Sequence, residues 1–196
     1  MGVVVRQSIK GTIMNYLGVL VGFITTFFIV TKYLTTEEVG LTRVLVDASI
    51  LLSSLAQLGT STSAMRYYPY FKDENERDHG FFGWSVLIPL IGFAFFTILF
   101  LIFKKPIENY FSQNSSLFVD YIYFVIPMAF FMMYLLVFET NSNLLMRIVI
   151  PRFIREVGIR LMTLAVYMMY AFDILNLDSI VMALCLTYGI ATILNI

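Results

Sequence analysis

Long apolar runs, separated only by short polar connections, constrain this chain more than any other feature. A helix needs roughly 20 mostly apolar residues to cross the hydrocarbon core of a bilayer. Hydrophobic residues make up 59% of the 196 residues and charged residues only 13%, whereas roughly a quarter of a soluble domain is charged. The sequence therefore predicts an all-α integral membrane protein without a separate soluble domain.

Six apolar segments can be placed along the chain, with Gly, Pro, Asn and Asp marking the breaks between them. We therefore expect a bundle of six transmembrane helices that forms a single domain over residues 1–196. The last apolar segment stops at YGIATILNI without a polar flank, so a C-terminal half is expected to be missing. The predicted helices are 11–31, 41–65, 81–103, 117–138, 157–172 and 179–196.

The distribution of basic residues predicts the orientation, because cytoplasmic connections carry an excess of Lys and Arg. Alternate connections place nine of the 13 basic residues on one side and four on the other. The N-terminus is therefore predicted to be cytoplasmic. The nine are Arg6, Lys10, Arg66, Lys72, Arg77, Arg147, Arg152, Arg155 and Arg160, and the four are Lys32, Arg43, Lys104 and Lys105.

Polar side chains recur within the second apolar segment. At about 100° per residue, Arg43, Asp47, Ser54, Gln57 and Ser61 would share one stripe about 80° wide. Arg43 and Asp47 alone could be an i,i+4 ion pair at a hydrated helix end. The three shorter side chains lie deeper and cannot reach the interface. The stripe therefore predicts a water-filled cavity or a polar contact between helices.

The first segment has a seam of small residues, in which Gly18 and Gly22 form a GxxxG pattern that allows close helix packing. Asn15 lies in the same seam, and its amide needs a polar partner or water. Pro89 and Pro127 interrupt the third and fourth segments. Each proline is predicted to be either a hinge of a moving helix or a static kink.

Arginines concentrate in the connection expected after the fourth helix. Positive-inside anchoring alone can account for Arg152, Arg155 and Arg160. The functional alternative is attraction of anionic headgroups or of a pyrophosphate at the inner leaflet.

Residues for catalysis or metal binding are sparse. The only histidine, His79, lies in the charged stretch DENERDHG, and Cys185 is the only cysteine, so one chain can form neither a disulfide nor a thiolate metal site. The sequence contains no catalytic motif. The net charge of zero offers no basic footprint for nucleic acid. We therefore expect neither an enzyme nor a cofactor-binding or metal-binding protein.

Several short motifs occur in a fixed order relative to the six predicted helices, and together they cover nearly the whole chain. They are NYLG at 15–18, KYLTTEEVGL at 32–41, LAQLG at 55–59, AMRYYP at 64–69 and VIPRFIREVGIRL at 149–161. Through them the sequence resembles the polysaccharide flippases of the multidrug, oligosaccharidyl-lipid and polysaccharide exporter superfamily. Two residues depart from that pattern: Lys32, where an Arg is common, and Val39, where an aromatic residue often precedes Gly.

This resemblance implies one half of a MATE-like transporter, in which two six-helix bundles face a central cavity in the bacterial cytoplasmic membrane. Such a protein moves lipid-linked oligosaccharide on a polyprenyl pyrophosphate carrier by alternating access, amid membrane lipids and glycan-assembly proteins. On this hypothesis, Arg43 or Arg66 would meet the phosphates. Asp47 would hold Arg43 or titrate. The residues expected to bind sugar hydroxyls are Asn15, Ser54, Gln57 and Ser61.

Two alternatives stay open. A drug or cation exporter of the same superfamily would have a similar architecture, but such exporters commonly carry an acidic residue in the first helix, and here that helix has none. A non-transporting subunit could instead anchor glycan-synthesis enzymes through its arginine-rich connection.

Overall fold

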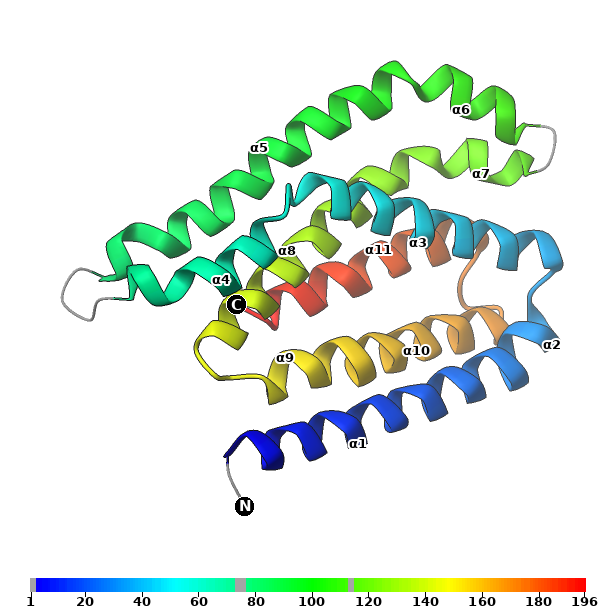
Figure 1. Cartoon of the computed structure of the whole chain (residues 1–196). Coiled ribbons are helices and arrows are strands. Elements are labelled where there is room, and N and C mark those ends of the chain that lie inside the picture. Colours follow the sequence, from blue (N-terminus) through cyan, green and yellow to red (C-terminus); the bar gives the residue numbers. More distant parts are fainter. Residues whose placement is uncertain (1–2, 73–76, 113–114) are drawn as a thin grey trace.

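The computed structural model describes residues 3–72, 77–112 and 115–196, and this part of the chain is helical without any strand (Figure 1). The prediction of an all-α protein is confirmed. In chain order the elements are α1 (Val3–Ile24), η1 (Thr25–Val30), α2 (Thr31–Tyr33), α3 (Thr36–Ala56), α4 (Thr60–Phe71), η2 (Arg77–Gly80), α5 (Phe81–Ile102), α6 (Lys104–Phe111), α7 (Ser116–Tyr121), η3 (Ile122–Phe124), α8 (Val125–Leu144), α9 (Val149–Phe153), η4 (Ile154–Gly158), α10 (Ile159–Ala171) and α11 (Leu177–Ile193).

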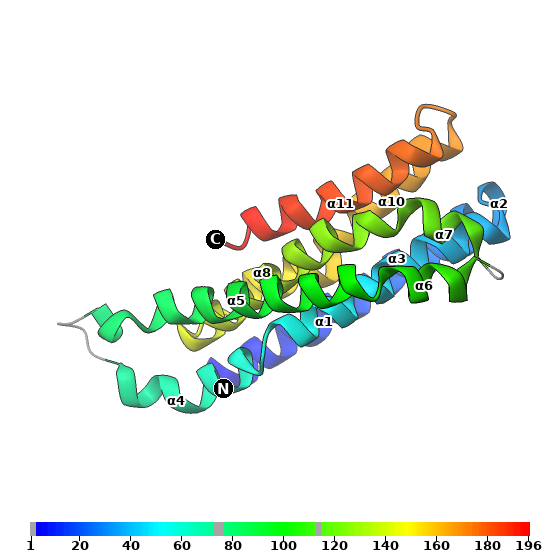
Figure 2. The same ribbon diagram turned by 90° about the horizontal axis from the view of Figure 1, so that it is seen from above.

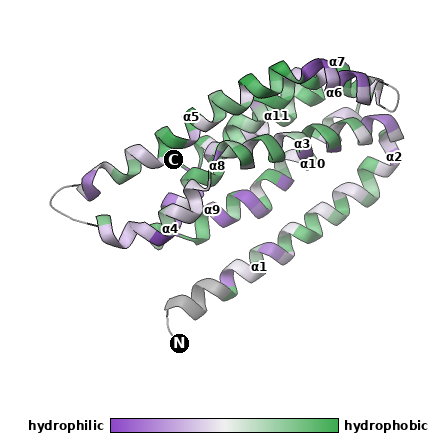
Figure 3. Ribbon diagram, turned by 45° about the horizontal axis from the view of Figure 1, so that its top comes forward, coloured by the Kyte–Doolittle hydropathy of each residue, from purple (hydrophilic) through white to green (hydrophobic). Residues whose placement is uncertain are grey.

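Within the described residues, 4 helical segments are long and apolar enough to cross a membrane: Ile9–Tyr33, Thr36–Phe71, Asp78–Ile102 and Leu117–Leu144. Leu177–Ile193 is apolar but shorter. The segment from α9 to α10 carries several charged residues (Figure 3). The fold therefore has several helices of membrane-spanning length, and a count of six crossings stays a prediction.

The second predicted helix, 41–65, is wrong at its start and in its continuity. A capping box begins α3 at Thr36: the Glu38 backbone N–H donates to Thr35 Oγ1 at 3.3 Å, and the Thr35 N–H donates to Glu38 Oε2 at 2.8 Å. The helix then breaks before α4, where Leu58 and Gly59 have φ of 49° and 73°. A left-handed backbone at two consecutive residues cannot continue a right-handed helix.

The connection predicted at 139–156 is also mostly wrong, because α8 continues to Leu144 and helix resumes at Val149. The first predicted helix, 11–31, also starts too late, because α1 begins at Val3. The third and sixth predicted helices differ from α5 and α11 by one to three residues at their ends. Residues 152–156, which were predicted to lie in a connection, are therefore helical, and their helix packs against α1.

Helix α8 forms the centre of the bundle, with α3, α4, α5 and α11 packed around it (Figures 1 and 2). Its side chains Val125, Met128, Ala129 and Met133 are fully buried. By contrast, only 17% of the most apolar window in each of the first and third candidate spans is buried. The outward faces of α1 and α5 therefore expose apolar side chains, as suits contact with acyl chains.

Helix α1 packs chiefly on the segment from α9 to α10 (Figure 1). The approach is closest at Gly18, where an added Cβ would lie 2.3 Å from the Glu156 carbonyl oxygen. Gly22 lies against the Arg160 side chain, and Gly11 against that of Arg152. The small-residue seam thus lets α1 lie directly on the charged helix and form one wall of a cavity.

Candidate functional site

A cavity of about 560 Å³ opens between the α1–η1 helix, α3, α8 and the η4–α10 helix. We call it the polar cavity. Apolar side chains such as Met132 and Leu135 form part of its wall, but hydroxyl and charged groups are prominent. The hydroxyl-bearing residues of the wall are Thr25, Thr26, Thr42, Ser53, Ser54, Thr163, Tyr167 and Tyr188.

Several of these hydroxyls already donate their hydrogen to their own helix. Thr25 Oγ1 donates to the Val21 carbonyl at 2.8 Å, and the Ser53 and Ser54 hydroxyls donate to the Ile50 carbonyl at 2.8 and 2.7 Å. A hydroxyl oxygen keeps lone pairs that can accept further hydrogen bonds. These side chains therefore present mainly acceptors to the cavity, which suits a ligand rich in hydroxyl donors.

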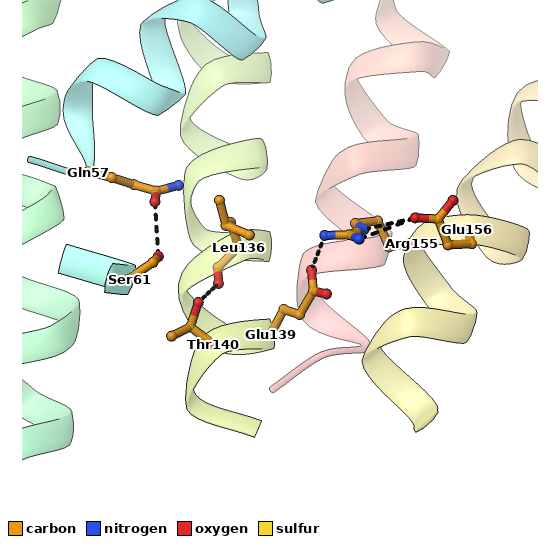
Figure 4. A network of polar contacts seen from close by, with 7 residues as sticks. All are labelled: Gln57, Ser61, Leu136, Glu139, Thr140, Arg155 and Glu156. Carbon is orange, nitrogen blue, oxygen red and sulfur yellow. Dashed lines mark hydrogen bonds and ion pairs between the residues drawn. The ribbon is translucent and has the colours of Figure 1, made fainter. Parts of the chain in front are cut away.

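An ion-pair network in the wall of the polar cavity joins α8 to η4 (Figure 4). Arg155 Nη1 lies 2.9 Å from Glu139 Oε2, and Arg155 Nη2 lies 3.2 Å from Glu156 Oε1. Arg160 Nη2 contacts the other carboxylate oxygen of Glu156 at 3.5 Å. The Glu139 side chain is 8% exposed and that of Arg155 39%, so the network joins a buried carboxylate to the more hydrated part of the cavity.

The charges of the cavity wall are unequal. Three arginines, Arg43, Arg155 and Arg160, face two carboxylates, Glu139 and Glu156, which leaves a formal excess of one positive charge. Both carboxylates are paired with arginine. Within the described residues, Arg43 forms no ion pair, and its side chain is exposed to the cavity. The wall therefore favours an anionic group over a cation.

Two π-helical segments, η1 and η4, border the polar cavity and direct some of their side chains into it. In an α-helix, residues five apart point about 140° away from each other. The wider π turn of η4 lies between Arg155 and Arg160 and brings both side chains to the cavity. On the opposite wall, η1 supplies Thr25 and Thr26. Such π turns within α-helices frequently lie at functional sites.

The structure separates the polar residues predicted along the second helix. Arg43 and Ser54 line the polar cavity, whereas Asp47 is exposed outside its wall. The Arg43–Asp47 ion pair considered from the sequence is absent from the described residues, so Asp47 does not hold Arg43 in place. At 100° per residue, the face of α3 that lines the cavity runs from Thr42 to Ser54, and Asp47 lies just outside that face.

Gln57 and Ser61 lie at the break between α3 and α4, away from the polar cavity. The Gln57 side chain is buried and accepts a hydrogen bond of 2.9 Å from the Ser61 hydroxyl (Figure 4). The helical stripe assumed a continuous helix through both residues, and the break removes that geometry. Their local hydrogen bond instead satisfies polar groups where the backbone turns.

Other predicted residues lie in different surroundings. Asn15 is exposed on α1, and Arg66 is exposed on α4, both outside the polar cavity. Pro89 is buried inside α5. Pro127 lies in the first turn of α8, after the 3-10 segment η3, where a missing backbone N–H is tolerated. Whether either proline acts as a hinge stays a prediction.

Sequence reasoning missed Glu139 and Glu156, and it assigned Arg155 and Arg160 to a cytoplasmic surface. One signal was available: Glu156 and Arg160 have the i,i+4 spacing of a helical ion pair. No local pattern links Glu139 to Arg155, because they meet only through packing of α8 on the later helix. In the described part of the chain, no group of three or more His, Cys, Asp or Glu side chains could hold a metal ion.

Comparisons with known proteins found that the chain matches no family model, no curated protein sequence and no solved structure. The functional interpretation therefore depends on the polar cavity and its charges.

Proposed function

We propose that this chain is one half of a bacterial flippase that moves lipid-linked oligosaccharide across the cytoplasmic membrane by alternating access. The polar cavity supports this proposal most directly, because it brings charged and hydroxyl groups together among helices of membrane-spanning length. A charged side chain costs about 2.5–3.5 kcal/mol at the bilayer centre on insertion scales. Polar groups gathered around an open volume of about 560 Å³ fit a hydrated substrate path.

The charges of the wall suit the head of a polyprenyl pyrophosphate carrier. Arg43, which has no ion-pair partner in the described part of the chain, would bind a phosphate oxygen, and Arg160 would contribute a second guanidinium. Ser54 and the neighbouring hydroxyls would accept hydrogen bonds from sugar hydroxyls. The lipid tail would stay in the bilayer. Gln57, Ser61 and Arg66 have no role in this cavity.

The wider architecture belongs to the same proposal. Six crossings with a cytoplasmic N-terminus would put the α4–α5 connection and the end of α8 on the cytoplasmic side. A second, related bundle would close the polar cavity from the opposite side. Bending at Pro89 or Pro127 would accompany the change between inward-facing and outward-facing states.

The observed charges weigh against a drug or cation exporter. A cation needs an available carboxylate, and both carboxylates of the polar cavity contact arginine. An anchoring subunit of a glycan-synthesis complex would have no use for a polar cavity at membrane depth. The flippase accounts for both the cavity and its excess positive charge.

A transport experiment on Arg43 tests the proposal. The protein would be produced from its own gene as Arg43→Gln, with Lys32→Gln as a control that removes an exposed cation outside the cavity. One charge-assisted hydrogen bond contributes about 1.5–3 kcal/mol, so we expect Arg43→Gln to slow export at least about tenfold. Surface polysaccharide and cytoplasmic lipid-linked oligosaccharide would both be measured at matched protein levels.

The two variants give opposite expectations. Arg43→Gln should lower surface polysaccharide and raise the cytoplasmic lipid-linked intermediate, while Lys32→Gln should resemble the unmodified protein. Normal export by Arg43→Gln, and also by the double variant Arg43→Gln/Arg160→Gln, would refute the proposed role of the polar cavity.

A further inference from the structure

A second cavity, also of about 560 Å³, lies between α4 and α5, away from the polar cavity. We call it the α4–α5 groove. Its wall is mainly apolar and aromatic, and Leu58, Tyr67, Phe71 and Trp84 remain 56%, 49%, 43% and 61% exposed. Both helices belong to segments long and apolar enough to cross a membrane. The groove therefore opens to the surface that acyl chains would surround.

The α5 wall of the groove is held in place by packing at two points. At the deep end, Gly92 of α5 lies against the α3–α4 break, and a Cβ there would be only 2.1 Å from the Ala56 carbonyl oxygen. Midway along the wall, the Asn141 side-chain amide donates a hydrogen bond of 3.1 Å to the Ser85 hydroxyl oxygen and ties α5 to α8. The break directs α4 away from the line of α3 (Figures 1 and 2), which leaves the groove beside α5.

A positively charged side chain, Arg66, lies next to the α4–α5 groove. The Arg66 guanidinium lies over the ring of Tyr67, 5.7 Å from its centroid, and Tyr67 lines the groove. Arg66 is exposed and forms no ion pair with any residue that the structure describes. It lies about 8 Å along the helix from the end of α4, so its long side chain can extend toward the headgroup level.

We propose that the α4–α5 groove is a specific phospholipid site, in which one acyl chain fills the groove and Arg66 binds the phosphate. Apolar contacts alone give little selectivity, because a free acyl chain is already surrounded by other acyl chains. The guanidinium supplies the selectivity, since phosphate is the group of a membrane lipid that it recognises best. The count of basic residues puts this site in the cytoplasmic leaflet. The inference does not depend on the proposed transport function.

Trp84 provides a direct test, because it is the only tryptophan of the chain and lines the groove. The intact protein would be reconstituted in bilayers that mix dibrominated phosphatidylglycerol with unbrominated digalactosyldiacylglycerol of the same chain length. Bromine quenches tryptophan fluorescence on contact, so quenching against lipid composition gives the relative affinity of the two lipids. The double variant Trp84→Phe/Ile91→Trp moves the probe to an exposed position of α5 outside the groove.

At Trp84 we expect phosphatidylglycerol to be favoured about fivefold over the galactolipid, as one basic side chain near anionic lipid allows. At position 91 the two lipids should compete almost equally. Arg66→Gln should abolish the preference at Trp84, whereas Lys105→Gln, which removes an exposed cation elsewhere, should leave it unchanged. Equal preference at the two probe positions, or a preference that survives Arg66→Gln, would overturn the proposal. So would a Trp84 that no brominated lipid quenches, because another copy of the chain would then cover the groove.

Discussion

Replacing Gly18 by alanine tests the packing that builds the polar cavity. The added methyl group would lie 2.3 Å from the Glu156 carbonyl oxygen, whereas ordinary contacts begin at 3.4 Å, so the two helices must separate by 3.4 − 2.3 = 1.1 Å. That oxygen belongs to the backbone of η4 and cannot rotate away. Separation at this point would move Glu156 and Arg155, and with them the charged wall of the cavity.

The expected cost follows from two opposing effects. Overpacking a close contact typically costs about 1–3 kcal/mol, while alanine in a helix is favoured over glycine by about 1 kcal/mol. Together these effects give a loss of about 0–2 kcal/mol in the free energy of unfolding for Gly18→Ala, and we expect the upper end because the contact is with backbone. Gly40→Ala is the matched control, because Gly40 lies in α3 and its added Cβ would meet nothing within 4 Å. It should raise the free energy of unfolding by up to about 1 kcal/mol.

The measurement is the reversible loss of helicity in mixed micelles as the fraction of denaturing detergent increases. Gly22→Ala gives an intermediate case, because its added Cβ would meet the Arg160 side chain at 3.2 Å and that side chain can move. The expected order of stability is therefore Gly40→Ala, then Gly22→Ala, then Gly18→Ala. A Gly18→Ala protein as stable as the Gly40→Ala protein would refute the close approach of α1 to η4.

Two further predictions concern the ion-pair network and the helix break. Arg155→Ala should lower the free energy of unfolding by about 2 kcal/mol, because it leaves the buried Glu139 carboxylate without its ion pair; Glu139→Gln should cost about 1 kcal/mol or less, since Arg155 keeps Glu156. The same unfolding titration measures both, and equal losses would contradict this asymmetry. Gly59→Ala should cost about 1 kcal/mol because its φ is 73°, whereas Gly83→Ala, inside α5 with open space around it, should be neutral or stabilising; thermal melts that rank them in reverse would contradict the left-handed turn.

Local chemistry in the sequence was informative about the helices themselves. The apolar runs predicted an all-helical chain with helices of membrane-spanning length, because a backbone in lipid must satisfy its hydrogen bonds internally. The spacing of Gly18 and Gly22 predicted close helix packing, and both glycines do lie against the later charged helix. The capping box of Thr35 and Glu38 was readable too, although the sequence interpretation began that helix at residue 41.

The sequence predicted only some of the residues that line the polar cavity. Arg43 and Ser54 face the polar cavity, but Gln57 and Ser61 do not, because left-handed conformations at Leu58 and Gly59 end the helix that the periodicity assumed. A glycine in the sequence does not by itself predict a helix break, since glycines are common within transmembrane helices.

The sequence by itself determined that this chain forms apolar helices and which of their faces carry small or polar residues, because composition and spacing act within each helix. Only the tertiary structure decided which polar residues meet. Glu139 and Arg155 lie in different helices, so the periodicity of a single helix cannot relate them. Their contact depends on how α8 packs against the helix that contains η4. A buried charge is stable only beside a partner or water, and where that partner lies is a property of the packed bundle.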